Sequence, residues 1–151
     1  MRAGGEGNTD QGPRAFSALD VAGAVGLSRA EIRAWRSLGR ERLAAGQAAA
    51  ACDILAYACF LDPSNAPSWE LLAAACLAAG RMDGASRAIA AAGGLEPTWK
   101  RAVLAALCAA ARGDEVEIER WRTEARRLAA SDPEERAMVE KALVALPGEE
   151  S

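Results

Sequence analysis

The sequence contains no histidine, the side chain that titrates nearest neutral pH and the commonest metal ligand. Its four cysteines, Cys52, Cys59, Cys76 and Cys108, form no Cys-x-x-Cys pair, whereas structural zinc sites need closely spaced ligands. The sequence also has no phosphate-cradling glycine motif and no serine or cysteine with an evident base nearby. It therefore predicts no enzyme, no cofactor and no metal, and the cysteines are expected to be small buried apolar side chains in a reducing compartment.

Long hydrophobic runs and strand-forming residues are also scarce. No apolar stretch is long enough to cross a bilayer, and no signal-peptide hydrophobic region is present, so we expect a cytoplasmic protein that does not enter membranes. Aromatic residues make up 5% of the 151 residues, and alanine and leucine dominate, which favours helices over strands. The net charge of −3 argues against nonspecific nucleic-acid binding. Composition thus predicts one all-α domain.

Two stretches of the chain match when they are offset by 34 residues. The matching pairs are Trp35 with Trp69, Leu38 with Leu72, Gly39 with Ala73, Gly46 with Gly80, Ala51 with Ala85, Leu55 with Ile89, Ala58 with Ala92 and Pro63 with Pro97. Such a period is typical of stacked helical hairpins, each of which buries its apolar face only against its neighbours. Gly39 and Ala73 are expected to lie opposite Ala51 and Ala85, so that the two helices of a hairpin approach closely.

This pattern resembles the tetratricopeptide repeat over about residues 32–99. The main departures are Arg42 and Cys76, where that repeat usually has tyrosine. The resemblance implies a right-handed superhelix of about three repeats (32–65, 66–99 and 100–133) with capping helices at both ends. We expect residues 1–12 to be a flexible tail and residues 13–147 a single domain. The third repeat is degenerate because Pro133 follows Pro97 by 36 residues; counted back from Pro133, Trp121 takes the place of a small residue.

Caps and breaks predict where the helices begin and end. The expected helices are an N-terminal helix over 13–25 with Phe16, Leu19 and Val25 as core contacts, then 29–45, 47–61, 66–79, 82–92, a helix capped by Thr98 and running to Arg112, 115–130 and 133–146. Ser28 with Glu31 forms a potential capping box before the first repeat, and Asp132 is a potential N-cap of the last helix. In the last helix, Met138, Leu143 and Leu146 are expected to point inward.

In tetratricopeptide repeats the first helix of each hairpin lines a concave groove that binds peptides. The resemblance carries those positions onto Arg33, Arg36, Arg40 and Leu43, onto Pro67, Glu70, Ala74 and Leu77, and, in a less certain register, onto Arg101, Leu104, Cys108 and Ala111. Trp35 and Leu38 are then expected on the core side of their helix. The groove would be basic at one end and apolar elsewhere, which suits an extended peptide with an acidic portion and small aliphatic anchors. The alternative is that the arginines are merely solvated.

Three repeats with terminal helices in a small acidic chain resemble the chaperones of type III secretion. Residues 55–92 are most similar to the class that holds translocator subunits, and residues 95–133 are also similar to the chaperones of needle or export components. This resemblance implies a partner that is an aggregation-prone export substrate, with no catalysis, and it leaves open a homodimer through the N-terminal helix. A second hypothesis is a DNA-binding regulator, because residues 18–40 resemble a helix-turn-helix whose arginines would face DNA.

Overall fold

The computed structural model describes residues 26–148, in which every regular element is helical. The elements are α3 (Arg29–Ala44), α4 (Ala48–Leu61), α5 (Ala66–Ala78), α6 (Met82–Ala91), the short 3-10 helix η2 (Ala92–Gly94), α7 (Trp99–Arg112), α8 (Glu115–Leu128) and α9 (Pro133–Leu143). No helix in this part of the chain is long and apolar enough to cross a membrane. The expected tail at 1–12 and N-terminal helix at 13–25 lie outside the described residues.

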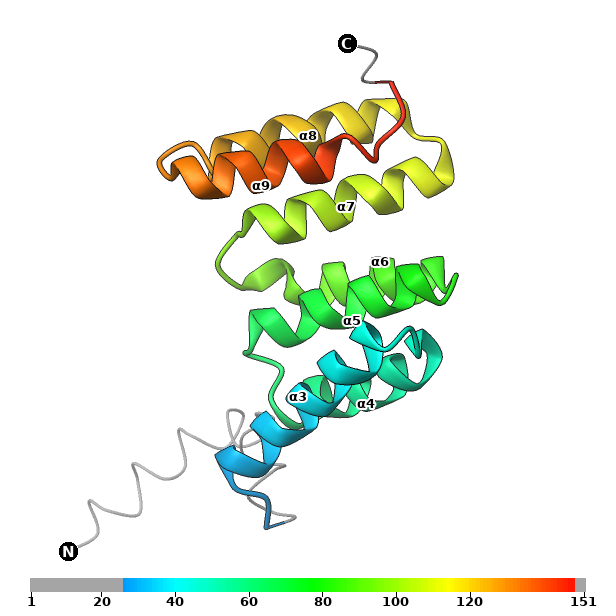
Figure 1. Ribbon diagram of the computed structural model, residues 1–151, viewed down its shortest axis with the longest axis vertical. Helices are drawn as coiled ribbons and strands as arrows, with labels where there is room; N and C mark the ends of the chain where they lie inside the picture. Colours follow the sequence, from blue (N-terminus) through cyan, green and yellow to red (C-terminus); the bar gives the residue numbers. More distant parts are fainter. Residues whose placement is uncertain (1–25, 149–151) are drawn as a thin grey trace, which may run out of the picture.

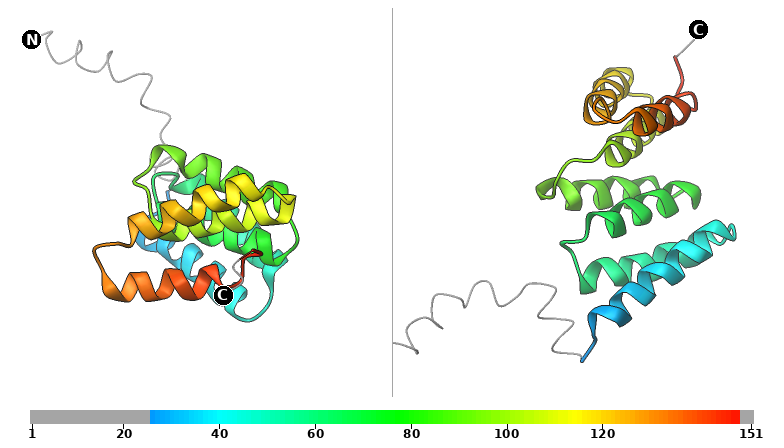
Figure 2. Two further views of the ribbon diagram at one scale, coloured as in Figure 1. Left: turned by 90° about the horizontal axis from the view of Figure 1, so that it is seen from above. Right: turned by 60° about the vertical axis from the view of Figure 1, so that its left-hand side comes forward.

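The helices form a stack of antiparallel pairs that rises along the long axis of the molecule (Figure 1). Helix α3 packs on α4, α5 on α6 and α7 on α8. The first two pairs contact each other through α4 and α5. Helix α9 packs on both α7 and α8 at the far end of the stack, as the side view in Figure 2 also shows. This arrangement confirms the predicted all-α fold of stacked helical hairpins.

The predicted caps are present at both ends of the described stack. The Ser28 side chain accepts a hydrogen bond from the Glu31 backbone N–H at 3.2 Å, and the Ser28 N–H donates to the Glu31 carboxylate at 2.6 Å. Asp132 accepts from the N–H groups of Glu134 and Glu135 at the start of α9. Each cap satisfies helix-end donors that would otherwise lack a partner. Helix α9 ends at Leu143, three residues earlier than expected.

Three glycines end the first helices of the three hairpins. Gly46, Gly80 and Gly113 have φ values of 77°, 74° and 70°, a left-handed conformation that glycine adopts without steric cost. The second and third of these glycines are 33 residues apart, not 34. The third hairpin is therefore displaced by one residue from the 34-residue period.

Burial in α8 agrees with this displacement. The buried residues follow the same spacing, four residues and then three, in the second helices of the first and third hairpins. They are Ala51, Leu55 and Ala58 in α4, and Ile118, Arg122 and Ala125 in α8. The sequence-based placement of Trp121 at a small-residue position is wrong, because Ile118 occupies that position. The error came from counting back from Pro133, since four residues lie between the end of α8 and that proline and only one lies between the end of α4 and Pro63.

The close approach of α3 and α4 occurs at Gly39, as predicted, but against a different residue. A Cβ atom on Gly39 would lie 2.5 Å from Leu55 Cγ and 2.6 Å from Leu55 Cδ2, with Ile54 next nearest, so the expected neighbour Ala51 is not among its nearest contacts. Leu55 itself is fully buried. The absence of a side chain at Gly39 thus makes room for a large core residue.

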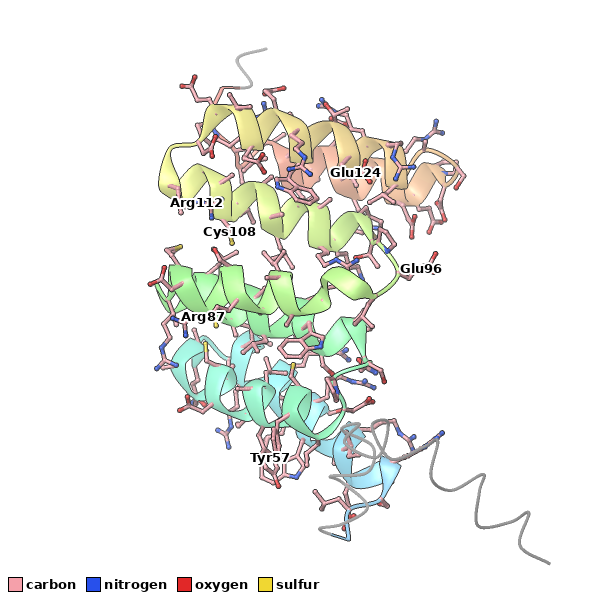
Figure 3. All side chains as sticks on the ribbon, turned by 180° about the vertical axis from the view of Figure 1, so that it is seen from behind. Tyr57, Arg87, Glu96, Cys108, Arg112 and Glu124 are labelled. Atoms are coloured by element: carbon pink, nitrogen blue, oxygen red, sulfur yellow. The ribbon has the colours of Figure 1, made fainter. Side chains whose placement is uncertain are left out.

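Helix α7 belongs to two hydrophobic cores. The first core is built mainly from α4, α5 and α6 and includes Cys108 of α7, which Figure 3 shows on the side of α7 that faces α6. The second is built from α7, α8 and α9 and includes Ala102, Val103 and Ala106 of α7. All four cysteines are buried free thiols, as predicted.

Two expected core residues are exposed instead. Trp35 is 36% exposed and meets the ring of Tyr57 edge-to-face at 5.2 Å, on the outer side of α4 (Figure 3). Met138 is 54% exposed, while its neighbour Val139 is fully buried. Val139 and Leu143 are four residues apart and share one helical face, which leaves Met138 pointing away from that face.

Candidate functional site

A groove of about 460 Å³ lies between α5 and α7, with α3 at its edge. Its lining residues are Arg40, Pro67, Glu70, Leu71, Ala74, Trp99, Lys100, Val103 and Leu104. These residues come from α3, α5 and α7, the first helices of the three hairpins. We call this hollow the α5–α7 groove.

The α5–α7 groove contains five of the twelve positions that the sequence assigned to a groove. Arg40, Glu70, Ala74 and Leu104 all line it, together with Pro67. They come from three helices and are separated by up to 64 residues in the chain, so only the stacking of the hairpins brings them together.

The remaining predicted residues lie elsewhere. Arg33 and Arg36 border a separate hollow of about 310 Å³ next to Asp62, at the turn that follows α4. Leu43 and Leu77 are half-buried and pack against the first core. Arg33 and Arg36 therefore lie on a different surface from Arg40. Residues 18–25 of the helix-turn-helix hypothesis lie outside the described residues.

The displaced third hairpin explains which groove residues the sequence reasoning missed. Lys100 and Val103 lie 33 residues after Pro67 and Glu70, are their equivalents in the third hairpin, and line the groove together with them. Arg101 and Cys108, which were expected there, are buried away from the groove, and Ala111 is exposed outside it. The 33-residue interval from Gly80 to Gly113 was the signal in the sequence that would have identified Lys100 and Val103 as groove residues.

The two cations of the groove are exposed at its rim, whereas its carboxylate is buried. Arg40 and Lys100 are exposed, and neither makes an ion pair within residues 26–148; Lys100 Nζ lies 5.7 Å from the centre of the Trp99 ring. Glu70 is 9% exposed, and its carboxylate accepts a hydrogen bond from the Thr98 hydroxyl. The groove therefore offers a largely apolar floor with two cations free to pair with a ligand.

Apolar side chains make up most of the lining of the groove. Its apolar members are Pro67, Leu71, Ala74, Val103 and Leu104. Such a surface can bury aliphatic side chains, while the exposed cations contribute mainly to selectivity and association rate. The arrangement is suited to binding a peptide.

The fold has close relatives among solved structures. The chain is similar to PcrH, a tetratricopeptide-type chaperone of type III secretion that was solved in complex with the chaperone-binding region of PopB: the two are 27% identical, with a TM-score of 0.72 over 80% of this chain and 98% of PcrH. It shares its fold with a type III secretion complex from Aeromonas hydrophila, at 22% identity and a TM-score of 0.76, over 92% of this chain and 93% of that one. No protein-family model and no curated protein sequence matches the chain. The similarity to PcrH confirms the resemblance to these chaperones and agrees with the expectation of a non-enzymatic protein.

Proposed function

We propose that this chain is a cytoplasmic type III secretion chaperone that holds an extended segment of an export substrate in the α5–α7 groove. The observation that carries the proposal is that five predicted peptide-binding residues lie together in one groove of a PcrH-like fold. PcrH was solved with the chaperone-binding region of PopB, which supports a translocator segment as the ligand class.

The lining of the groove indicates the chemistry of that segment. Small aliphatic side chains suit the floor formed by Leu71, Ala74 and Val103, because burial of apolar surface is the main source of affinity in such contacts. Acidic residues at either side of these anchors would meet Arg40 and Lys100. The segment we expect is extended, with aliphatic anchors and nearby carboxylates.

A substitution that fills the groove tests the proposal. Ala74→Glu adds a charged side chain inside the groove without removing core atoms, and we expect it to weaken binding of the PopB chaperone-binding region at least tenfold, about 1.4 kcal/mol. Isothermal titration calorimetry measures this change. Ala78→Glu is the matched control, because Ala78 is exposed on the same helix outside the groove and its substitution should leave the affinity unchanged. Equal binding by the Ala74→Glu variant and the parent would show that the segment binds elsewhere.

A further inference from the structure

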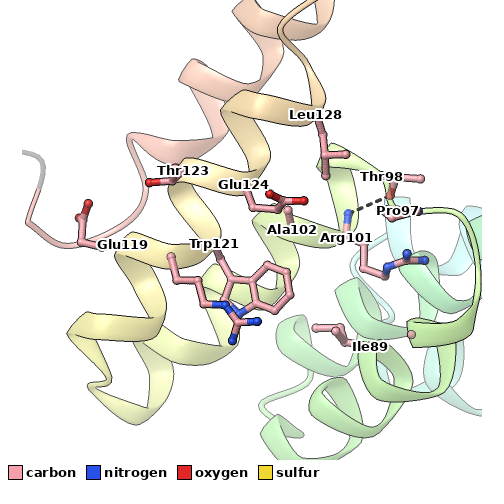
Figure 4. Close-up of a pocket in the computed structure, with 12 residues that line it drawn as sticks. Ile89, Pro97, Thr98, Arg101, Ala102, Glu119, Trp121, Thr123, Glu124 and Leu128 are labelled. Atoms are coloured by element: carbon pink, nitrogen blue, oxygen red, sulfur yellow. Dashed lines mark hydrogen bonds between the residues drawn. The ribbon is translucent and has the colours of Figure 1, made fainter.

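A cavity larger than the α5–α7 groove lies on another face of α7. It has a volume of about 770 Å³, within the usual range for ligand sites, and separates α8 from the segment that leads from α6 into α7 (Figure 4). Its walls include Ile89, Pro97, Thr98, Arg101, Trp121 and Leu128. We call it the α8 pocket. It shares no lining residue with the α5–α7 groove.

Arg101 gives this pocket a buried donor that lacks a partner. The residue is 9% exposed and stands 33 residues after the small buried Ser68 of α5, so a guanidinium fills a position that is small in the preceding hairpin. Its Nη2 donates to the carbonyl oxygens of Leu95 at 3.0 Å and Glu96 at 2.9 Å. Its Nη1 is buried with no hydrogen-bond partner within residues 26–148. Buried polar groups nearly always have partners, so the Arg101 guanidinium is incompletely satisfied by the protein.

The opposite wall of the pocket is apolar and centred on Trp121. The half-buried Trp121 ring lies in the middle of the pocket, with Ile89 below it and Leu128 above it in Figure 4. Its indole N–H donates to Glu117 at 3.1 Å, and the Arg120 guanidinium lies 5.1 Å from the ring centre. The orientation of Trp121 is therefore fixed by Glu117, outside the pocket, and by Arg120, which lines it, and the rest of the ring offers apolar surface to a ligand.

The carboxylates at the pocket are already matched by cations. Glu119 pairs with Arg122, and Glu124 pairs with Arg127 at 2.6 Å. The hydrogen bond from Arg127 lowers the pKa of Glu124, which remains ionised at neutral pH. Arg101, in contrast, has only neutral carbonyl partners. The pocket therefore has an unmatched positive charge next to an apolar wall.

We propose that the α8 pocket binds the carboxyl terminus of a partner protein whose last residue is aliphatic. The terminal carboxylate pairs with the positive charge of the Arg101 guanidinium, while the last side chain packs against Trp121 and Ile89. The last residue of a chain carries both the carboxylate and the aliphatic side chain. Because the chain ends there, it needs only one opening into the pocket. An acidic side chain within a chain supplies the anion without the adjoining aliphatic group.

Short peptides test the carboxylate requirement without altering the protein. The probes are acetyl-Ala-Ala-Ala-Leu with a free carboxyl terminus, the same peptide with a terminal amide, and acetyl-Ala-Ala-Glu-Ala amide. The indole N–H signal of Trp121 in the ¹⁵N-labelled full chain, assigned with a Trp121→Phe variant, reports binding. We expect the free acid to shift this signal and both amides to bind at least tenfold more weakly. Equal binding by either amide, or no shift with the free acid, would overturn the proposal.

Two protein variants separate this site from the α5–α7 groove. Leu128→Ala removes part of the apolar wall and should weaken the free-acid peptide several-fold, whereas Val116→Ala, at a site 78% exposed on the same helix, should not. Arg101→Gln should abolish the preference for the free acid over its amide. Ala74→Glu should leave this binding unchanged, so that failure of the groove proposal and failure of this one are distinguishable. An unchanged preference in a folded Arg101→Gln variant would assign the carboxylate contact to another residue.

Discussion

Replacing Gly39 by alanine should destabilise the protein even though alanine is the better helix former. The added Cβ would lie 2.5 Å from Leu55 Cγ, closer than real Cβ contacts come, and Leu55 is a fully buried core residue. Overpacking of this kind costs about 1–3 kcal/mol, and the gain in helix propensity returns about 0.5–1 kcal/mol. The difference is a net loss of about 1 kcal/mol, which corresponds to a melting temperature lower by about 3–5 °C.

Thermal and denaturant unfolding followed by circular dichroism measures this loss. Gly93→Ala is the matched control: Gly93 has no atom within 4 Å of its potential Cβ and no left-handed φ, so this substitution should be neutral or slightly stabilising.

A double substitution assigns the loss to one contact. Leu55→Ala removes both atoms that the new Cβ would meet, at a cost of about 2–5 kcal/mol. In that background, Gly39→Ala should no longer destabilise the protein, giving a coupling energy of about 1–2 kcal/mol between the two sites. A Gly39→Ala variant as stable as the parent would refute the close packing of α3 on α4.

Three further outcomes are expected. Arg40→Glu should weaken substrate binding about tenfold, with little change for Arg36→Glu, because only Arg40 lines the α5–α7 groove; calorimetry with both variants checks this division. Burial raises the pKa of the Cys59 thiol to about 12, so at pH 8 it should react with Ellman's reagent slowly in the native protein and rapidly after unfolding by guanidinium. A hydrogen bond from Arg126 lowers the pKa of Glu140, so the stability from this pair is present at neutral pH and is lost as pH falls below about 4.5; Glu140→Gln should reduce the loss of stability between pH 5 and 3 by under 1 kcal/mol, as measured by denaturant titration.

Local signals in the sequence were sufficient to predict most of the helices. Ser28 with Glu31 fixed the start of α3, Asp132 fixed the start of α9, and Gly113 fixed the end of α7. These features act within a few residues of the chain and depend little on the neighbouring helices. The matched pairs at 34-residue spacing predicted the stacking, because each hairpin buries its apolar face against the next.

The groove was predicted only in part because it depends on contacts between hairpins. Helical spacing placed Arg33, Arg36 and Arg40 on one face of α3, but it could not show that the start of α3 borders the turn at Asp62 while its end borders α5. The register of the third hairpin is fixed by its internal packing and not by the proline that follows it. The loop before Pro133 absorbs extra residues without moving Ile118 from its buried position, so the proline was a poor marker.

Helix α7 contributes to both hollows, with Val103 and Leu104 in the α5–α7 groove and Arg101 and Ala102 in the α8 pocket. Two ligands bound to one rigid helix are subject to thermodynamic linkage. If the first ligand changes the affinity for the second by some factor, the second changes the affinity for the first by the same factor. In a chaperone of this construction, a partner that docks on the outer face of α7 and thereby loosens the hold on the export substrate would itself be released when fresh substrate arrives.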